Sequence, residues 1–349
     1  MSPTVAVAHY PEGAGHATRM LAVARALETR GATVTLAGGG PGARFIEHNG
    51  YDQFEPSPVD FIGDYQGGSL LRVLAHSLPN SARRVYDYVR WLRHERPDAL
   101  VTDDMFAAMA AEFVDVPLFV CTHNAASYYD AVIEQGFTWL LNRHQLYAAE
   151  AFLYPSIWPP DRGDPAGVTP IPPIALDVPP ERTDTGRARV LADGASVPVG
   201  TGVPETDLAA DTPPVPDTEV LVVPSAYSTG FDALAERLRA AGHEATLVGD
   251  EDWECVPALL PHLRAAERVV CSGYSTIMEA AVAGTPCIVY PFTDEQHGVS
   301  RVIERTGLEG FQVEHSVSHV VRAVGQRLED PTYENGAGRA AATVLAGIE

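Results

Sequence analysis

The sequence contains no lysine, so all 24 positively charged side chains of this 349-residue chain are arginines. Aspartate and glutamate together number 46, which gives a formal net charge of −22. So negative a charge excludes nucleic acid as a partner, because such binding depends on cationic side chains that neutralise phosphates. Acidic side chains keep a protein soluble in concentrated salt, and the salt screens their repulsion. We therefore predict a protein of a high-salt cytoplasm.

Cysteines are few, and their spacing excludes two kinds of site. The four residues Cys121, Cys255, Cys271 and Cys287 include no CxxC pair, so a zinc ribbon and a thioredoxin-like motif are excluded. No uninterrupted apolar run reaches about 18 residues, so we expect no membrane-spanning helix. The first residues lack the charged segment and cleavage site of a signal peptide and predict a strand instead.

Short β-branched apolar runs alternate with segments of helical periodicity in two parts of the chain. The predicted strands are 4–9, 33–37, 99–102 and 118–121, and then 219–223, 245–248, 269–271 and 286–290. The predicted helices are 17–30, 41–49, 81–95 and 105–114, and then 230–241, 256–265, 276–283, 296–306, 317–328 and 336–346. Strands without a polar face predict parallel sheets covered by helices on both sides. The expected fold class is α/β, with two Rossmann-like doubly wound domains facing across a cleft.

Proline marks the boundary between these two parts. Residues 155–216 hold 14 of the 28 prolines, and residues 180–215 show little periodicity. We predict an N-terminal domain over 1–178, a linker rich in proline and aspartate over 179–216, and a C-terminal domain over 217–349.

The first loop, from Glu12 to Thr18, joins a strand to a helix and carries Gly13, Gly15 and His16. Glycine allows a close approach of the backbone to a ligand, and a helix N-terminus offers free N–H groups to an anion. A nicotinamide dehydrogenase is disfavoured, because Thr18 breaks the GxGxxG/A pattern and the second strand ends in two glycines rather than an acid. His16 is either a residue that exchanges protons with a ligand or a packed turn residue.

A second strand-to-helix turn carries Ser272, Gly273, Ser275 and Thr276, with Glu279 one turn later. Small hydroxyl residues and a glycine at this place can donate hydrogen bonds to phosphate, and the carboxylate could accept two ribose hydroxyls. The alternative is a capped helix with a solvated glutamate.

This stretch resembles the nucleotide-sugar-binding half of the GT-B glycosyltransferases. The family pattern is SGxxTxxEAxxxGxP, followed by a strand, a proline and an acid–Gln pair, and here that pair is Glu295-Gln296. The first loop, with GxGHxxR, resembles the other half of the same superfamily. The resemblance covers most of residues 1–125 and 217–310. It includes MurG-type enzymes (glycosyltransferase family 28 type) and the UDP-glucosyl and UDP-glucuronosyl transferases.

The resemblance implies roles on the donor side. Glu279 would hold the ribose, Ser275 and Thr276 the diphosphate, and Glu295 with Gln296 the hydroxyls of the sugar. The loop 225–230, with Ser228 and Thr229, would be a second phosphate loop, although it lacks the usual pair of glycines. Val299 stands where the family often has asparagine.

The resemblance also implies an acid–base pair. In glucosyl-transferring relatives a histidine matching His16 takes the proton of the acceptor hydroxyl, and an aspartate matching Asp103 orients it. In peptidoglycan-type relatives the histidine serves the diphosphate instead. Asp104 follows Asp103 and is expected to matter less.

These observations predict an inverting glycosyltransferase that uses a nucleotide-diphosphate sugar, with UDP as the expected nucleotide and no metal or other cofactor. A sugar-nucleotide 2-epimerase and a non-catalytic nucleotide-sugar-binding module are the alternatives. The acidic run 250–252 matches a DxD metal motif, but in so acidic a chain we interpret it as solvated.

An aromatic segment follows the first domain's strands. Residues 127–158 hold eight aromatic side chains: Tyr128, Tyr129, Phe137, Trp139, Tyr147, Phe152, Tyr154 and Trp158. Upstream lie Arg72, Arg83, Arg84, Arg90, Arg93 and Arg96. This pattern predicts either core packing or an apolar surface, which would be an acceptor groove or a peripheral contact with a membrane bearing a lipid-linked acceptor at its inner face.

Overall fold

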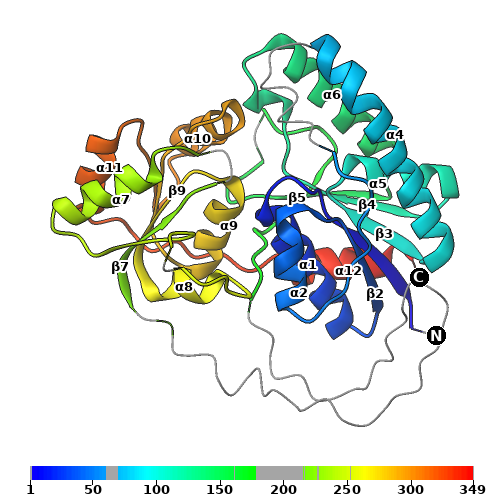
Figure 1. The fold of residues 1–349 in the computed structure, drawn as a ribbon, viewed down its shortest axis with the longest axis horizontal. Helices are drawn as coiled ribbons and strands as arrows, with labels where there is room; N and C mark the ends of the chain where they lie inside the picture. Colours follow the sequence, from blue (N-terminus) through cyan, green and yellow to red (C-terminus); the bar gives the residue numbers. More distant parts are fainter. Residues whose placement is uncertain are drawn as a thin grey trace, which may run out of the picture.

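The computed structural model describes residues 2–59, 70–160, 162–177, 215, 217–225, 228–251 and 253–348, and the side chains of 70–78 are excepted. The predicted linker 179–216 thus lies outside the described residues, apart from Val215. Two parallel sheets form the centres of two α/β domains (Figure 1). This confirms the predicted fold class.

The N-terminal sheet has six strands in the order β2-β1-β3-β4-β5-β6, and every pairing is parallel. Its strands are β1 (Thr4–Ala8), β2 (Thr33–Ala37), β3 (Ala99–Thr102), β4 (Leu118–Cys121), β5 (Ala151–Pro155) and β6 (Thr169–Ile171). Its helices are α1 (Ala14–Thr29), α2 (Ala43–His48), α4 (Leu70–Glu95), α5 (Met105–Val114) and α6 (Val132–Ala148), with 3-10 turns η1 (Gly40–Gly42) and η2 (Ala126–Tyr128). The predictions did not include α6, β5 and β6, nor the last strand of the C-terminal sheet, Phe311–Val313.

The C-terminal sheet has five parallel strands in the order β11-β10-β9-β7-β8. Its strands are β7 (Thr218–Val223), β8 (Ala245–Leu247), β9 (Ala266–Cys271), β10 (Cys287–Val289) and β11 (Phe311–Val313). Its helices are α7 (Phe231–Ala240), α8 (Leu260–Ala265), α9 (Tyr274–Ala283), α10 (Asp294–Thr306) and α11 (Val317–Val324). The chain adds its second strand on one side of β1 and its third on the other, and it does the same around β7. Each sheet therefore has a switch point, where loops can hold a ligand.

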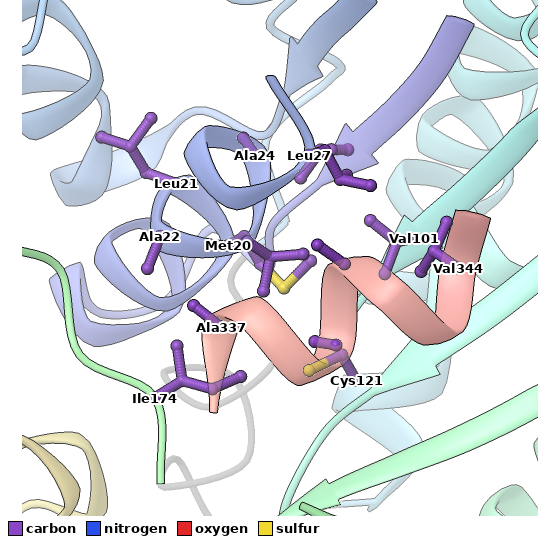
Figure 2. Close-up of a cluster of buried hydrophobic side chains, with 14 of the residues drawn as sticks. Met20, Leu21, Ala22, Ala24, Leu27, Val101, Cys121, Ile174, Ala337 and Val344 are labelled. Carbon is purple, nitrogen blue, oxygen red and sulfur yellow. The ribbon is translucent and has the colours of Figure 1, made fainter. Parts of the chain in front are cut away.

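The last helix, α12 (Ala337–Ala346), corrects one predicted boundary. It lies in the N-terminal domain, where Ala337 and Val344 are buried in one core with Met20 of α1 and Val101 of β3 (Figure 2). The predicted C-terminal domain of 217–349 included this helix. The apolar spacing of α12 shows which face is buried, but it does not show which domain buries that face.

The chain therefore crosses between the domains twice, and the two crossings are hydrogen-bonded to each other. Asn335 on the returning segment donates to the carbonyl of Ala175 on the outgoing one at 2.8 Å. The N–H of Gly336 donates to the carbonyl of Pro173 at 2.7 Å. These bonds join the two connections side by side at the edge of the N-terminal domain.

Candidate active site between the two domains

His16 and Asp103 meet at the switch point of the N-terminal sheet. His16 lies in the first turn of α1, after β1, and Asp103 follows the neighbouring strand β3. Nδ1 of His16 lies 2.8 Å from Oδ2 of Asp103. The N–H of Tyr10 donates to the other oxygen, Oδ1, at 2.7 Å. The structure thus brings together the two residues that the sequence paired.

Asp103 is fully buried, yet it is ionised. Burial alone would raise the pKa of Asp103, but His16 and Arg19 lower it to well below its usual range. An ionised carboxylate only accepts hydrogen bonds, so the 2.8 Å contact with Asp103 favours the His16 tautomer with its hydrogen on Nδ1, while the Arg19 NH2 group lies 3.1 Å from the same atom. In this tautomer Nε2 keeps a lone pair. The His16 side chain is 26% exposed, so Nε2 can take a proton from a bound molecule.

Arg19 and His123 extend this pair toward the C-terminal domain; the sequence analysis included Arg19 in the GxGHxxR motif without assigning it a role, and it missed His123. Arg19 lies one turn after His16, and its NH2 group donates to Asp103 Oδ2 at 2.5 Å. Its NH1 group donates to Nδ1 of His123 at 3.2 Å. His123 follows β4 as Asp103 follows β3, and its Nε2 donates to Oε1 of Glu295 at 2.9 Å. The i+3 spacing of Arg19 and the position of His123 after a strand were the signals that could have found them.

The serines of the two predicted phosphate loops lie together. The hydroxyl groups of Ser228 and Ser272 are 2.5 Å apart, and the N–H of Ser225 donates to Ser272 at 3.3 Å. Gln296 donates from Nε2 to the hydroxyl of Ser225 at 3.0 Å. Thr229, next to Ser228, is exposed.

Gln296 also caps α10. Its Oε1 accepts from the N–H groups of Phe292 at 2.8 Å and Thr293 at 3.2 Å, while the Thr293 hydroxyl accepts from the Gln296 N–H at 3.3 Å. This reciprocal capping box fixes the N-terminus of α10. The side chain of its neighbour Glu295 is 38% exposed, so part of the carboxylate is open to solvent.

The start of α9 packs against the start of α1. Gly273 is the N-cap of α9, and Ser275 and Thr276 lie half-buried in its first turn. A Cβ at Gly15 would collide with the Ser275 hydroxyl, so a side chain at Gly15 would separate the helices. Gly13 has φ 103°, a left-handed conformation that favours glycine and turns the chain into α1.

Glu279 lies in the interface between these helices. Burial raises its pKa to about 7, although a hydrogen bond from Thr18 and the charge of Arg19 oppose the rise. It is 7% exposed and lines, with Gly15 and Tyr274, a space between α1 and α9 that has no room for even a water molecule. In this arrangement Glu279 is therefore closed off from any ligand, and its predicted contact with a ribose stays a prediction.

Tyr274, at an unspecified position of the family pattern, reaches into the N-terminal domain. Its ring stacks on His123 with centroids 3.6 Å apart and an angle of 11° between the planes. Its hydroxyl donates to the carbonyl of Pro155. Val299 is 1% exposed and shares a core with Tyr128 of η2. Val299 is therefore buried in this arrangement and not available to a ligand.

Within the described residues, no cluster of histidine, cysteine and acidic side chains could hold a metal ion. Asp250 lies 3.9 Å from the Arg239 guanidinium, and Glu251 is exposed. Asp252, the third residue of the acidic run, lies outside the described residues.

The aromatic segment divides between core and surface. Tyr128, Phe152, Tyr154 and Trp158 are buried. On α6, six large apolar side chains are at least 48% exposed: Val132, Ile133, Phe137, Trp139, Leu140 and Tyr147. In the part of the chain that the structure describes, no helix is both long and apolar enough to cross a membrane.

The arginines upstream divide in the same way. Arg84 is buried in an ion pair with Asp104 at 2.7 Å, and Asp104 also accepts from Tyr88 at 2.8 Å. Arg83, Arg90, Arg93 and Arg96 are exposed, and the side chain of Arg72 lies outside the described residues. Asp104 is thus a core residue, and its smaller effect on the reaction stays a prediction.

The chain is similar to known proteins in part of its sequence and in its whole fold. No family model matches the sequence. The chain is similar to the protein named "Putative UDP-glucuronosyltransferase ugt-48" of Caenorhabditis elegans, with 34% identity over 92 residues. It is also similar to the nematode's "Putative UDP-glucuronosyltransferase ugt-47", with 35% identity over 92 residues. Each match covers 25% of this chain but less than a fifth of the relative, 18% and 17%.

Solved structures match the whole chain. The Streptomyces sp. SF2575 glycosyltransferase SsfS6, complexed with thymidine diphosphate, gives a TM-score of 0.61 at 14% identity, over 99% of this chain and 95% of that one. The glycosyltransferase SnogD from Streptomyces nogalater gives 0.60 at 17% identity over 100% of both chains. The chain has the GT-B fold. Arabidopsis thaliana UGT89C1, complexed with quercetin, shares the GT-B fold with a TM-score of 0.55 at 13% identity, over 100% of this chain and 92% of that one.

The loops that follow strands of the two sheets meet, because His123 after β4 bonds to Glu295 at the start of α10. Helix α1 and strand β3, beside which His16 and Asp103 lie, belong to one side of this junction, and α9 and α10 belong to the other (Figure 1). The narrower resemblance to MurG-type enzymes stays a prediction.

Proposed function

We propose that this chain is a glycosyltransferase that moves a sugar from a nucleotide-diphosphate donor to an acceptor hydroxyl, with inversion at the anomeric carbon. The observation that carries the proposal is the 2.8 Å contact between His16 and Asp103 at the junction of the two domains. The glycosyltransferases among the solved structures and the UDP-glucuronosyltransferases among the partial matches support it. The latter favour a UDP-sugar as the donor.

In the proposed reaction, His16 acts as the general base. Its Nε2 takes the proton of the acceptor hydroxyl while the hydroxyl oxygen forms a bond to the anomeric carbon. The bond from that carbon to the diphosphate oxygen breaks, and the nucleoside diphosphate leaves with the electron pair. Asp103 holds the imidazole by Nδ1 and stabilises the cation that forms. One displacement from the opposite face inverts the anomeric configuration.

The C-terminal domain would hold the donor. The N-terminus of α9, with Ser275 and Thr276, offers N–H groups and hydroxyls to the leaving diphosphate, so the proposal requires no metal. Glu279 would accept the ribose hydroxyls once the starts of α1 and α9 have moved apart, which leaves the bond between His123 and Glu295 in place. Glu295 presents one side of its carboxylate to the sugar, and Gln296 has a second amide hydrogen beyond the one bonded to Ser225.

The proposed acceptor is apolar, and a lipid-linked alcohol is the kind of acceptor that we favour. The support is the exposed apolar surface of α6. This helix is fixed to the loop that carries His123, because Asn142 donates to the carbonyl of Asn124 at 2.8 Å.

Incubation with a panel of nucleotide sugars in concentrated KCl tests the proposal. We expect one donor to raise the melting temperature, and Glu279→Ala to weaken that donor's binding. Products are analysed with the donor alone and with acceptor alcohols. Turnover of the donor alone to an epimer would indicate an epimerase. Binding without transfer or hydrolysis would indicate a binding module, and no binding by any nucleotide sugar would refute the proposal.

A further inference from the structure

A continuous chain of hydrogen bonds joins the histidine of the N-terminal domain to the acid of the C-terminal domain. It runs from His16 through Asp103, Arg19 and His123 to Glu295. Its last bond, at 2.9 Å, crosses from one domain to the other. The chain exists only while the domains are closed.

The hydrogen bonds on either side of His123 have a defined donor and acceptor. Arginine can only donate, so Arg19 NH1 requires a lone pair on Nδ1 of His123. The hydrogen of the neutral His123 ring therefore lies on Nε2 and points to Glu295. Burial lowers the pKa of His123 to about 4, which keeps the ring neutral, although the bond to Glu295 opposes the shift. His16, Arg19 and Glu295 are the charged or titratable groups that act on it.

His123 fixes one oxygen of Glu295 and leaves the other available. Oε1 accepts from His123, while Oε2 accepts no hydrogen bond from any described residue. The His123 side chain is only 7% exposed, whereas that of Glu295 is 38% exposed. The Tyr274 ring stacks on one face of the imidazole and holds it in place. Glu295 is therefore a partly exposed acceptor whose direction is set by a buried donor.

We propose that His123, held by Arg19, is a positioning residue for the donor sugar: it aims the free oxygen of Glu295 at a sugar hydroxyl and aligns the sugar with His16 when the domains close. This inference rests on the proposed function and deepens it. It explains why a buried arginine lies between two carboxylates of different domains. Correct alignment of reacting groups contributes strongly to rate, so loss of His123 should lower both sugar affinity and turnover.

The test compares His123→Ala with the parent protein for two ligands, the nucleotide sugar found in the panel and its free nucleoside diphosphate. We expect the nucleotide sugar to bind roughly tenfold to 150-fold more weakly, as for a lost hydrogen bond to a charged group. Affinity for the nucleoside diphosphate, which lacks the sugar, should change by less than about threefold. The turnover number should fall as well. His123→Gln, which retains an N–H donor, should restore part of both losses.

His144 provides a matched control. Its Nε2 lies 2.9 Å from Oε1 of Glu112, the same bond at an exposed site on α6. His144→Ala should leave both affinities unchanged. The double variant His123→Ala/Glu295→Gln should bind the sugar no more weakly than the weaker single variant, because both substitutions remove one interaction.

The outcomes separate this inference from the proposed function. Equal weakening of both ligands by His123→Ala would show that His123 only joins the domains, and would overturn the inference. Unchanged affinity and turnover would overturn it too, with the proposed function intact. A parent protein that binds no nucleotide sugar would overturn both.

Discussion

At the scale of single residues, the environment of each group decides its chemistry more than its type does. Asp103 and Asp104 are neighbours, and both are buried beside arginines. Asp103 holds a histidine that is partly exposed in the cleft, whereas Asp104 caps α5 and binds Arg84 within the core. Substitutions at Asp104 should therefore affect folding, and those at Asp103 should affect turnover.

His16→Ala should lower the transfer rate by roughly 10²–10⁴-fold and leave donor affinity nearly unchanged, because the base is lost and the donor's contacts remain. Asp103→Asn should cost less, since the imidazole remains but its orientation and its cation lose support. Donor affinity and turnover are measured separately on both variants. If His16→Ala weakened donor binding and Asp103→Asn did little, His16 would serve the diphosphate instead. A fully active His16→Ala protein would exclude both roles.

Glu279 should make stability depend on pH in a defined direction. Its pKa rises from 4.5 to about 7 on folding, so the folded state keeps a proton that the unfolded state releases between these values. Stability is therefore lost as pH rises through this window. Glu279→Gln should be more stable than the parent by up to about 3 kcal/mol at pH 8 and equal to it near pH 4.5. Urea unfolding at fixed KCl measures this, and a difference that does not vary with pH would contradict it.

At the scale of elements, the alternation of strands and helices could be predicted, and with it the positions of His16 and Asp103. The elements that were missed are those with weak local signals. β6 is three residues long and contains Pro170, and α6 exposes apolar residues and so lacks a clear polar face. Arg19 received no role and His123 was missed because their partners come from distant segments, so local spacing can mark the two positions but not the contacts.

The contact between α10 and η2 makes a prediction at this scale. A Cβ at Gly298 would collide with the backbone of Tyr128, whereas a Cβ at Gly136 on α6 would meet nothing within 4 Å. Gly298→Ala should therefore keep the domains apart, with a larger radius of gyration in X-ray scattering and slower transfer. Gly136→Ala, the same change in another helix, should leave both unchanged and stabilise slightly. An unaltered scattering curve for Gly298→Ala would show that closure does not need this contact.

At the scale of the whole molecule, charge dominates. A net charge of −22 with no lysine repels itself, and salt screens that repulsion. The melting temperature should rise as KCl increases from about 0.15 M to about 2 M, where the screening length falls from about 8 Å to a few ångström. Calorimetry across this series measures the effect. A melting temperature that stays level or falls would remove the basis for predicting a high-salt cytoplasm.

The return of the chain to the N-terminal domain has a consequence for modularity. Because α12 completes the core around Met20, and Asn335 is bonded to Ala175 where the chain leaves, the C-terminal domain is in topological terms an insert with adjacent ends. A chimaera that joins this N-terminal half to another protein's donor half at one junction would remove α12 from the core of its own domain. Exchanging the insert at both junctions would keep that core whole, so the C-terminal domain could be replaced as a unit.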